Sequence, residues 1–86
     1  MHLLLFASAF CDPCIRTRTV IEQVSKLVPA ATITELDIVS DIDEAERAGI
    51  RSTPTVIVRA DDETEVFRAE GVPTVNQMLA ALAQAI

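Results

Sequence analysis

Two cysteines, Cys11 and Cys14, carry the clearest chemical signal in the sequence. They follow a short apolar run, residues 3–7, that is typical of a buried strand, and they open an amphipathic stretch typical of a helix. Side chains at positions i and i+3 of a helix share a face, so the two sulfurs can reach bonding distance. A cysteine pair between a strand and a helix therefore predicts a redox centre that cycles between dithiol and disulfide.

The two cysteines are expected to play different roles. Cys11 lies nearer the strand end and the surface, where the free N–H groups and the positive dipole of a helix start stabilise a thiolate. We therefore expect Cys11 to be the activated sulfur, and Cys14, one turn further in, to be the less accessible one. The carboxylate of Asp12 opposes this activation, because a neighbouring negative charge disfavours a second one.

Other uses of a cysteine pair have less support. A structural disulfide would close a very small loop, and a reducing compartment would not maintain it. Structural zinc needs about four ligands, and beyond the pair the chain offers only His2 and carboxylates. We expect His2 to be an exposed strand residue. We expect no metal, and no cofactor other than the redox-active disulfide of Cys11 and Cys14.

The start of the chain does not predict a secretory leader, although it is apolar. It has no basic segment, and a leader of this layout runs to about 15 residues or more. The chain also lacks the run of about 18 apolar residues that a membrane-spanning helix requires. We therefore expect a soluble cytoplasmic protein without a membrane partner, and there a lone cysteine pair is typically catalytic or metal-binding.

Length and composition limit the class of protein. The chain has 86 residues, half of them hydrophobic, which suits one domain over residues 1–86 and excludes intrinsic disorder. Lysine and arginine number 7, against 13 aspartates and glutamates, for a net charge of −6. Because a nucleic-acid surface needs an excess of cations, we expect no nucleic-acid partner.

The hydrophobic pattern predicts an α/β fold, a four-stranded mixed sheet with helices on both faces. The first strand, helix and strand require a parallel right-handed crossover, and the last two strands add an antiparallel hairpin. In the second strand the alternation changes phase at Thr34 and Glu35, which predicts a register irregularity. The expected elements are strand 3–7, helix 12–28, strand 32–39, helix 40–48, strand 54–59, strand 65–68 and a final helix from 74.

Local signals mark the helix ends. Asp41 with Glu44, and Thr74 with Gln77, have the spacing of a capping box at a helix N-terminus. Gly49 stands where a left-handed C-cap belongs. These signals predict where the second helix starts and stops and where the last helix starts.

Two segments resemble the thioredoxin family, and they occur in the family's order. Residues 6–14, Phe-Ala-Ser-Ala-Phe-Cys-Asp-Pro-Cys, resemble the family's active site, where Trp usually stands at Phe10 and Gly at Asp12. Residues 49–55, Gly-Ile-Arg-Ser-Thr-Pro-Thr, resemble the segment that carries the family's cis-proline. Gly71 falls where these proteins keep a glycine before the last helix. The resemblance covers nearly the whole chain.

The resemblance implies the thioredoxin fold and a thiol-disulfide oxidoreductase that reduces protein disulfides, with the first cysteine as nucleophile and the second as resolving thiol. It implies a cis Thr53–Pro54 bond opposite the pair, with the Thr53 backbone pairing a substrate strand, although Pro54 alone would suit the start of any strand. Pro13 and Val72 also have local explanations, as a first-turn proline and a helix staple. The implied substrate-binding residues are Phe10, Asp12, Pro13, Thr53, Pro54, Gly71 and Val72.

The chain also departs from the family pattern. We expect the family's first strand and helix to be absent, as in the shorter fold shared with glutaredoxins. Leu5 replaces the buried Asp that assists deprotonation of the second cysteine, and Glu35 replaces its Lys partner, so we expect the buried ion pair to be missing. Cys14 should then lose its proton to solvent or to the departing thiolate. Thr19 replaces a helix-kinking proline, which predicts a straighter first helix.

The resemblance also implies partners: disulfide-bearing client proteins and a thioredoxin-reductase-type electron donor, with the protein itself a monomer. The alternative is a glutaredoxin-like redoxin that uses glutathione or donates electrons to ribonucleotide reductase. Glutaredoxins usually hold glutathione with a Gly-Gly and an acid pair before the last helix. This chain has a single glycine there, Gly71, preceded by Glu70, whose charge would repel the carboxylates of glutathione.

Overall fold

The computed structural model describes residues 1–86 and contains a four-stranded sheet with the strand order β2-β1-β3-β4. β1 pairs in parallel with β2 and antiparallel with β3, and β3 pairs antiparallel with β4. This mixed sheet confirms the predicted fold class and element order. The elements are β1 (His2–Ala7), α1 (Asp12–Leu27), β2 (Thr32–Asp37), α2 (Ile42–Ala48), β3 (Thr55–Arg59), β4 (Glu65–Glu70) and α3 (Val75–Gln84).

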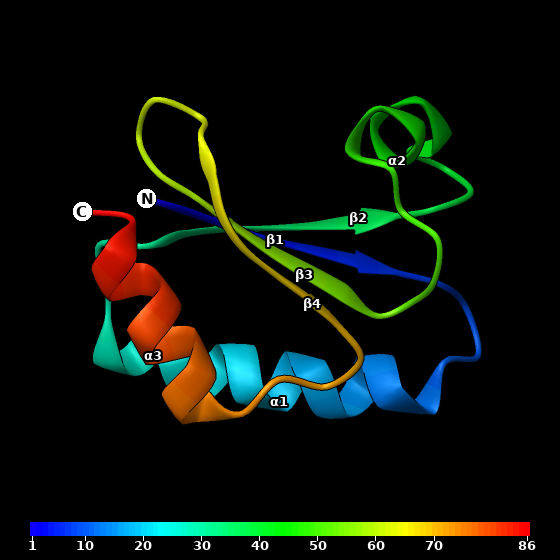
Figure 1. The fold of residues 1–86 in the computed structure, drawn as a ribbon. Helices are drawn as coiled ribbons and strands as arrows, with labels where there is room; N and C mark the ends of the chain where they lie inside the picture. Colours follow the sequence, from blue (N-terminus) through cyan, green and yellow to red (C-terminus); the bar gives the residue numbers. More distant parts are fainter.

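Helices cover both faces of the sheet (Figure 1). α1 and α3 lie together on one face, and α2 lies alone on the other. Leu3 and Leu5 of β1 belong to the larger core cluster, with residues of α1 and α3, whereas Phe6 packs in a smaller cluster with Ala45 of α2. β1 is therefore buried on both faces, as its continuous apolar run predicts. None of the three helices combines the length and the hydrophobicity of a membrane-spanning segment.

β2 runs beside β1 in unbroken register, so the irregularity expected at Thr34 and Glu35 is wrong. Each residue of β2 has its partner in β1, including Leu5 opposite Glu35. Ile33 and Glu35 share the face toward α1, while Leu36 packs with the cluster on the α2 side. Because both faces of the sheet are covered, apolar residues occupy either face of β2, and this interrupts the alternation in the sequence.

The start of α2 lacks the capping box that Asp41 and Glu44 predict. Asp41 is the N-cap residue, but its side chain makes no bond to the helix; it accepts a hydrogen bond from the Asp37 N–H at 2.9 Å. The carboxylate thus closes the turn between β2 and α2. At the other end, Gly49 is left-handed, with φ 68°, which confirms the predicted C-cap.

The start of α3 has the capping box that the sequence predicts. Thr74 Oγ1 accepts a hydrogen bond from the Gln77 N–H at 3.0 Å, and Gln77 Oε1 accepts one from the Thr74 N–H at 2.8 Å. Two N–H groups that would otherwise lack a partner are satisfied. The cap fixes where α3 begins, and so the path of the segment between β4 and α3.

Replacing Thr74 with Ala should lower the free energy of unfolding by about 1 kcal/mol, because the Gln77 N–H loses its acceptor. Equilibrium unfolding in urea, followed by circular dichroism, measures the change. Thr74→Ser keeps the hydroxyl and is the matched control, so its midpoint should stay close to that of the unmodified protein. An unchanged midpoint for Thr74→Ala would show that the cap does not contribute to stability.

Candidate active site

Strand pairing brings the predicted site segments to one end of the sheet. β1 and β3 are antiparallel neighbours with Phe6 opposite Thr55, so the loop after β1 and the loop before β3 lie at the same end. Thr55 is also opposite Glu70, the last residue of β4, so the segment after β4 starts there too. This is the right-hand end of the sheet in Figure 1, where α1 also begins.

Cys11 and Cys14 form a disulfide in the first turn of α1, with 5.2 Å between their Cα atoms. Cys11 is the N-cap residue of α1, and its sulfur accepts a hydrogen bond from the Cys14 N–H at 3.2 Å. An N–H at the positive end of a helix stabilises negative charge on its acceptor, which favours the thiolate form of Cys11 in the reduced protein. Nowhere in the structure do three His, Cys, Asp or Glu side chains gather as a metal-binding group.

The two sulfur-bearing residues differ in their access to solvent. Cys14 is 0% exposed and belongs to the larger core cluster. Cys11 is half-buried and packs against the edge of that cluster. This is the asymmetry that the sequence predicts, and it leaves Cys11 as the cysteine that presents surface to an incoming molecule.

Phe10, next to Cys11, has a fully exposed ring and a left-handed backbone. Its φ of 56° is uncommon for a bulky residue, and such strained conformations cluster at functional sites. Asp12, also exposed, and Pro13 occupy the first two positions of α1. The sequence identifies Phe10 as an apolar neighbour of the pair, but nothing in the sequence indicates its backbone conformation.

The loop before β3 carries the predicted proline. The Thr53–Pro54 peptide bond is cis, and Pro54 is buried. The Pro54 carbonyl accepts a hydrogen bond from the Gly71 N–H at 2.9 Å, and Gly71 itself is left-handed, with φ 102°. Val72 follows with a partly exposed side chain. The structure therefore brings Pro54 and Gly71 together, although the sequence separates them.

The structure has two sets of polar contacts at this end of the sheet that the sequence does not predict. The hydroxyls of Ser8 and Thr53 are hydrogen-bonded at 2.7 Å, although they lie 45 positions apart. Glu70 accepts hydrogen bonds from Arg51 at 2.7 Å and from Ser52 at 3.3 Å. The Arg51 guanidinium holds the pKa of the Glu70 carboxyl below its usual range. Such distant pairs have no local sequence signal, since only the tertiary fold makes them neighbours.

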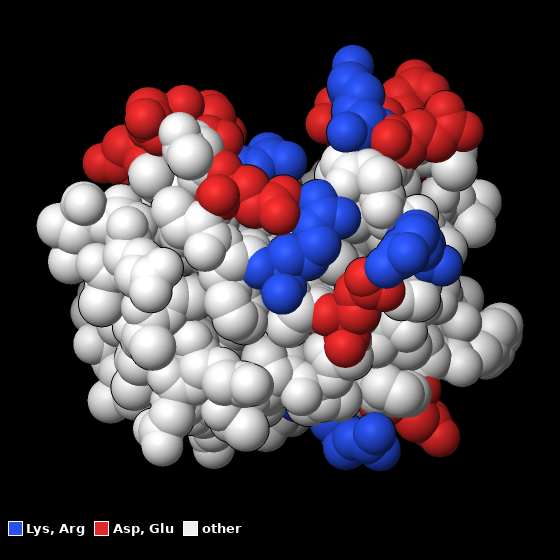
Figure 2. All heavy atoms as spheres, in the orientation of Figure 1, with Lys and Arg blue, Asp and Glu red and all other residues white.

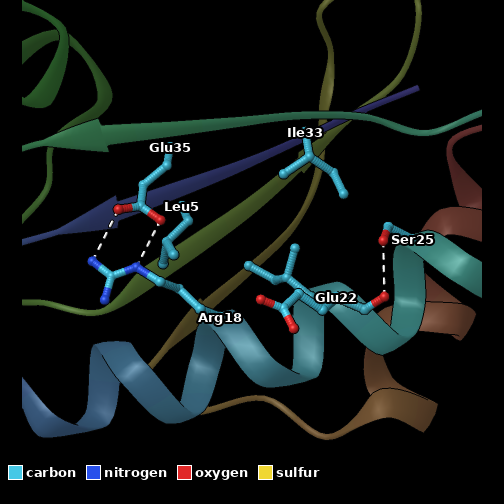
Figure 3. Close-up of a pocket in the computed structure, with 7 residues that line it drawn as sticks. Leu5, Arg18, Glu22, Ser25, Ile33 and Glu35 are labelled. Atoms are coloured by element: carbon cyan, nitrogen blue, oxygen red, sulfur yellow. Dashed lines mark hydrogen bonds and ion pairs between the residues drawn. The ribbon is translucent and has the colours of Figure 1, made fainter.

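An ion pair between Arg18 and Glu35 joins α1 to β2 (Figure 3). The sequence predicts that the family's buried ion pair is missing. Arg18 donates two hydrogen bonds to the Glu35 carboxylate, at 2.8 and 2.9 Å, beside a hollow of about 230 Å³ that Leu5 also lines. The bond to Glu35 raises the pKa of Arg18. The two side chains are 40% and 45% exposed, so the pair is a surface contact. Leu5 beneath it is buried and apolar, as expected.

Part of the surface carries no charged side chains. Residues 71–86, which include all of α3, contain no Lys, Arg, Asp or Glu. In Figure 2 the lower left of the molecule, over α3, is correspondingly white, whereas acidic side chains gather at the β3–β4 turn and around α2. Val72 therefore belongs to an uncharged segment, although the protein as a whole carries a net charge of −6.

Comparisons with known proteins agree with this geometry. The Thioredoxin family model matches residues 1–84. A thioredoxin from Chlamydia muridarum is 36% identical over 70 residues, which cover 81% of this chain and 68% of the relative. A thioredoxin from Chlamydia trachomatis is 31% identical over 77 residues, which cover 90% of this chain and 74% of the relative.

Solved structures share the fold. Thioredoxin-2 of the malaria parasite matches with a TM-score of 0.87 over 96% of this chain and 81% of its own, at 19% identity. Thioredoxin 1 of Thermosipho africanus matches with a TM-score of 0.82 over 98% of this chain and 92% of its own, also at 19% identity. At this identity the likeness shows the fold alone. The family match and the relatives go further: the chain belongs to the thioredoxin family, and with its Cys11–Cys14 pair it is a thiol-disulfide oxidoreductase.

Proposed function

We propose that the protein reduces disulfides of client proteins, with Cys11 as nucleophile and Cys14 as resolving thiol. The observation that carries the proposal is the asymmetry of the pair. Cys11 is accessible and its sulfur accepts the Cys14 N–H at a helix start, whereas Cys14 is completely buried. The thiolate is the nucleophile in disulfide exchange, so the cysteine that is only half-buried and is stabilised as a thiolate attacks first.

The reaction has two exchange steps. In the reduced protein the Cys11 thiolate attacks one sulfur of the client disulfide, a mixed disulfide forms, and the other client sulfur leaves as a thiolate. Cys14 then attacks the Cys11 sulfur, so that the bond between the two cysteines forms and the second client sulfur is released. Two electrons pass to the client, and an external donor later returns two electrons to the pair.

Cys14 must lose its proton in the second step. Leu5, at the position of the family's buried Asp, is apolar and buried, so it supplies no base. Direct transfer to solvent is disfavoured because Cys14 is 0% exposed. The remaining proton acceptor is the client thiolate that departs in this second step, and it leaves as a thiol when it takes the proton.

The client is proposed to bind on the rim around the pair. Phe10 offers an exposed apolar ring beside Cys11, and Val72 adds a partly exposed side chain from an uncharged segment. Burial of such apolar surface favours association. The Thr53 main chain, next to the cis Pro54 bond, would pair with an extended segment of the client, as the family resemblance implies.

A reductase of the thioredoxin-reductase type is proposed as electron donor. The cytoplasm is proposed as the compartment. The protein is proposed to act as a monomer and to need no cofactor besides its cysteines. Support comes from the family and from the segment before α3. That segment has Gly71 without a second glycine, and Glu70 beside it is already bonded to Arg51, so the glutathione site of a glutaredoxin is not matched. Glutathione is the alternative donor.

Turnover with each donor tests the proposal. With NADPH, thioredoxin reductase and insulin, the protein should support continuous NADPH oxidation, and Cys11→Ser should reduce it to background, because the attacking thiolate is lost. Replacing the reductase with glutathione and glutathione reductase should give much slower turnover. Turnover with glutathione alone would favour the glutaredoxin-like alternative, and activity that survives in Cys11→Ser would contradict the proposed role of Cys11.

Asp12→Asn should increase the rate at which iodoacetamide alkylates Cys11 at pH 7 by about two- to threefold. The reason is the removal of a negative charge beside the thiolate, which is a modest effect at an exposed position. Glu22→Gln makes the same change in net charge ten positions further along α1, about 15 Å away, and should leave the rate unchanged. Equal rates for Asp12→Asn and Glu22→Gln would show that Asp12 does not restrain Cys11.

A further inference from the structure

We propose that Ser8 is a positioning residue for client binding: its hydroxyl, bonded to Thr53, holds the loop before β3 in place against the cysteine loop. The inference rests on the proposed function, in which the Thr53 main chain pairs with the client. Ser8 is the first residue after β1 and lies three positions before Cys11. Thr53 immediately precedes Pro54. The Ser8–Thr53 bond therefore connects the segment that carries the nucleophile with the segment that receives the client.

The bond is well placed to act as a link between the two loops. The hydroxyl oxygens lie 2.7 Å apart, both side chains are half-buried, and either hydroxyl can donate. A short hydrogen bond that is partly shielded from water is held more firmly than one on the open surface. Ser8 therefore has a defined partner, and the contact does not depend on a mobile surface side chain.

The other bonds of the loop before β3 lead elsewhere. The Pro54 carbonyl accepts the Gly71 N–H at 2.9 Å, and Arg51 and Ser52 donate to Glu70, so these contacts fasten the loop to the end of β4. The Ser8–Thr53 bond is the one side-chain hydrogen bond in the structure between residues 8–14 and residues 49–54. Without it, the cysteine loop and the client-binding loop would be joined only through the sheet below them and by packing.

The side chain of Thr53 can transmit this restraint to its own main chain. Threonine is branched at Cβ, so χ1 has few allowed values. When Oγ1 is fixed by Ser8, the orientation of the Thr53 N–H and C=O groups is restricted as well. A client strand that pairs with those groups then meets them at a set position relative to Cys11, whereas a small disulfide that only touches the Cys11 sulfur does not use them.

The cysteine loop itself gains from the link. Residues 8–10 are irregular, and Phe10 has a left-handed backbone that the surrounding structure must maintain. The bond between the hydroxyls of Ser8 and Thr53 is the only side-chain hydrogen bond that these three residues make. Loss of the bond should therefore make the cysteine loop less well positioned for client binding. It should leave the buried surroundings of Cys14 intact.

The test compares a protein client with a small disulfide. With thioredoxin reductase as donor, Ser8→Ala should raise the KM for insulin by about three- to tenfold, the effect of one lost hydrogen bond, and leave kcat within about twofold. The rate with the small aromatic disulfide 5,5′-dithiobis(2-nitrobenzoic acid) should change by less than about twofold. Ser8→Thr keeps the hydroxyl and should restore the KM. Ser25→Ala, a serine on α1 that bonds only to the Glu22 carbonyl, is the control.

A double-mutant cycle identifies the bond as the cause. Ser8→Ala and Thr53→Val each remove the same hydrogen bond. If Ser8 acts through Thr53, the double variant should therefore have the same KM for insulin as the single variant with the larger KM. Independent effects that add would contradict this link. An unchanged KM in Ser8→Ala, or an equal loss with both substrates, would overturn the inference, since the bond would then have no role or a purely structural one. A wild-type protein that reduces neither substrate would contradict the proposed function itself, and the inference with it.

Discussion

The antiparallel pairing of β1 with β3 is the constraint on which the site depends. It sets Phe6 opposite Thr55, so the chain leaves β1 toward the cysteines at the same end of the sheet where it enters β3 from Pro54. β1 can hold this central position because its residues are apolar and both of its faces are covered by helices. A shift of one residue would exchange Phe6, which packs on the α2 side, with Leu3 and Leu5, which pack on the side of α1 and α3, so the fit of the two clusters holds the register and thereby the site.

The same arrangement divides the work between the two cysteines. α1 packs on the sheet through a face that includes Cys14, and this packing removes Cys14 from solvent. Cys11 lies one turn earlier, at the N-cap, where the helix supplies an N–H to its sulfur and the surface remains open. Solvent access and thiolate stabilisation therefore coincide at Cys11, because α1 starts between the two cysteines. The chemistry follows from where α1 begins.

Much of this could be predicted from the sequence, because it depends on local patterns. The apolar run of β1, the spacing of Cys11 and Cys14 and the capping box at Thr74 each express a short-range rule. The errors arise where tertiary contacts decide. β2 has apolar residues on both of its covered faces, and Glu35 pairs with Arg18 on one of them. Asp41 bonds back to the turn before α2 in place of the helix. The Ser8–Thr53 bond and the backbone of Phe10 have no local pattern at all, so sequence reasoning could name the rim but could not find what holds it together.

The sulfur that first bonds to a client is the most direct test of the central claim. The reduced Cys14→Ser protein, mixed with a peptide disulfide, should accumulate a one-to-one mixed disulfide on Cys11, because the thiol that would resolve it is gone. Mass spectrometry of the digested adduct locates the bond. The Cys11→Ser protein should form little adduct, because Cys14 is buried. Adduct formation at the same rate in both variants, or in Cys11→Ser alone, would contradict the assignment of Cys11 as the nucleophile.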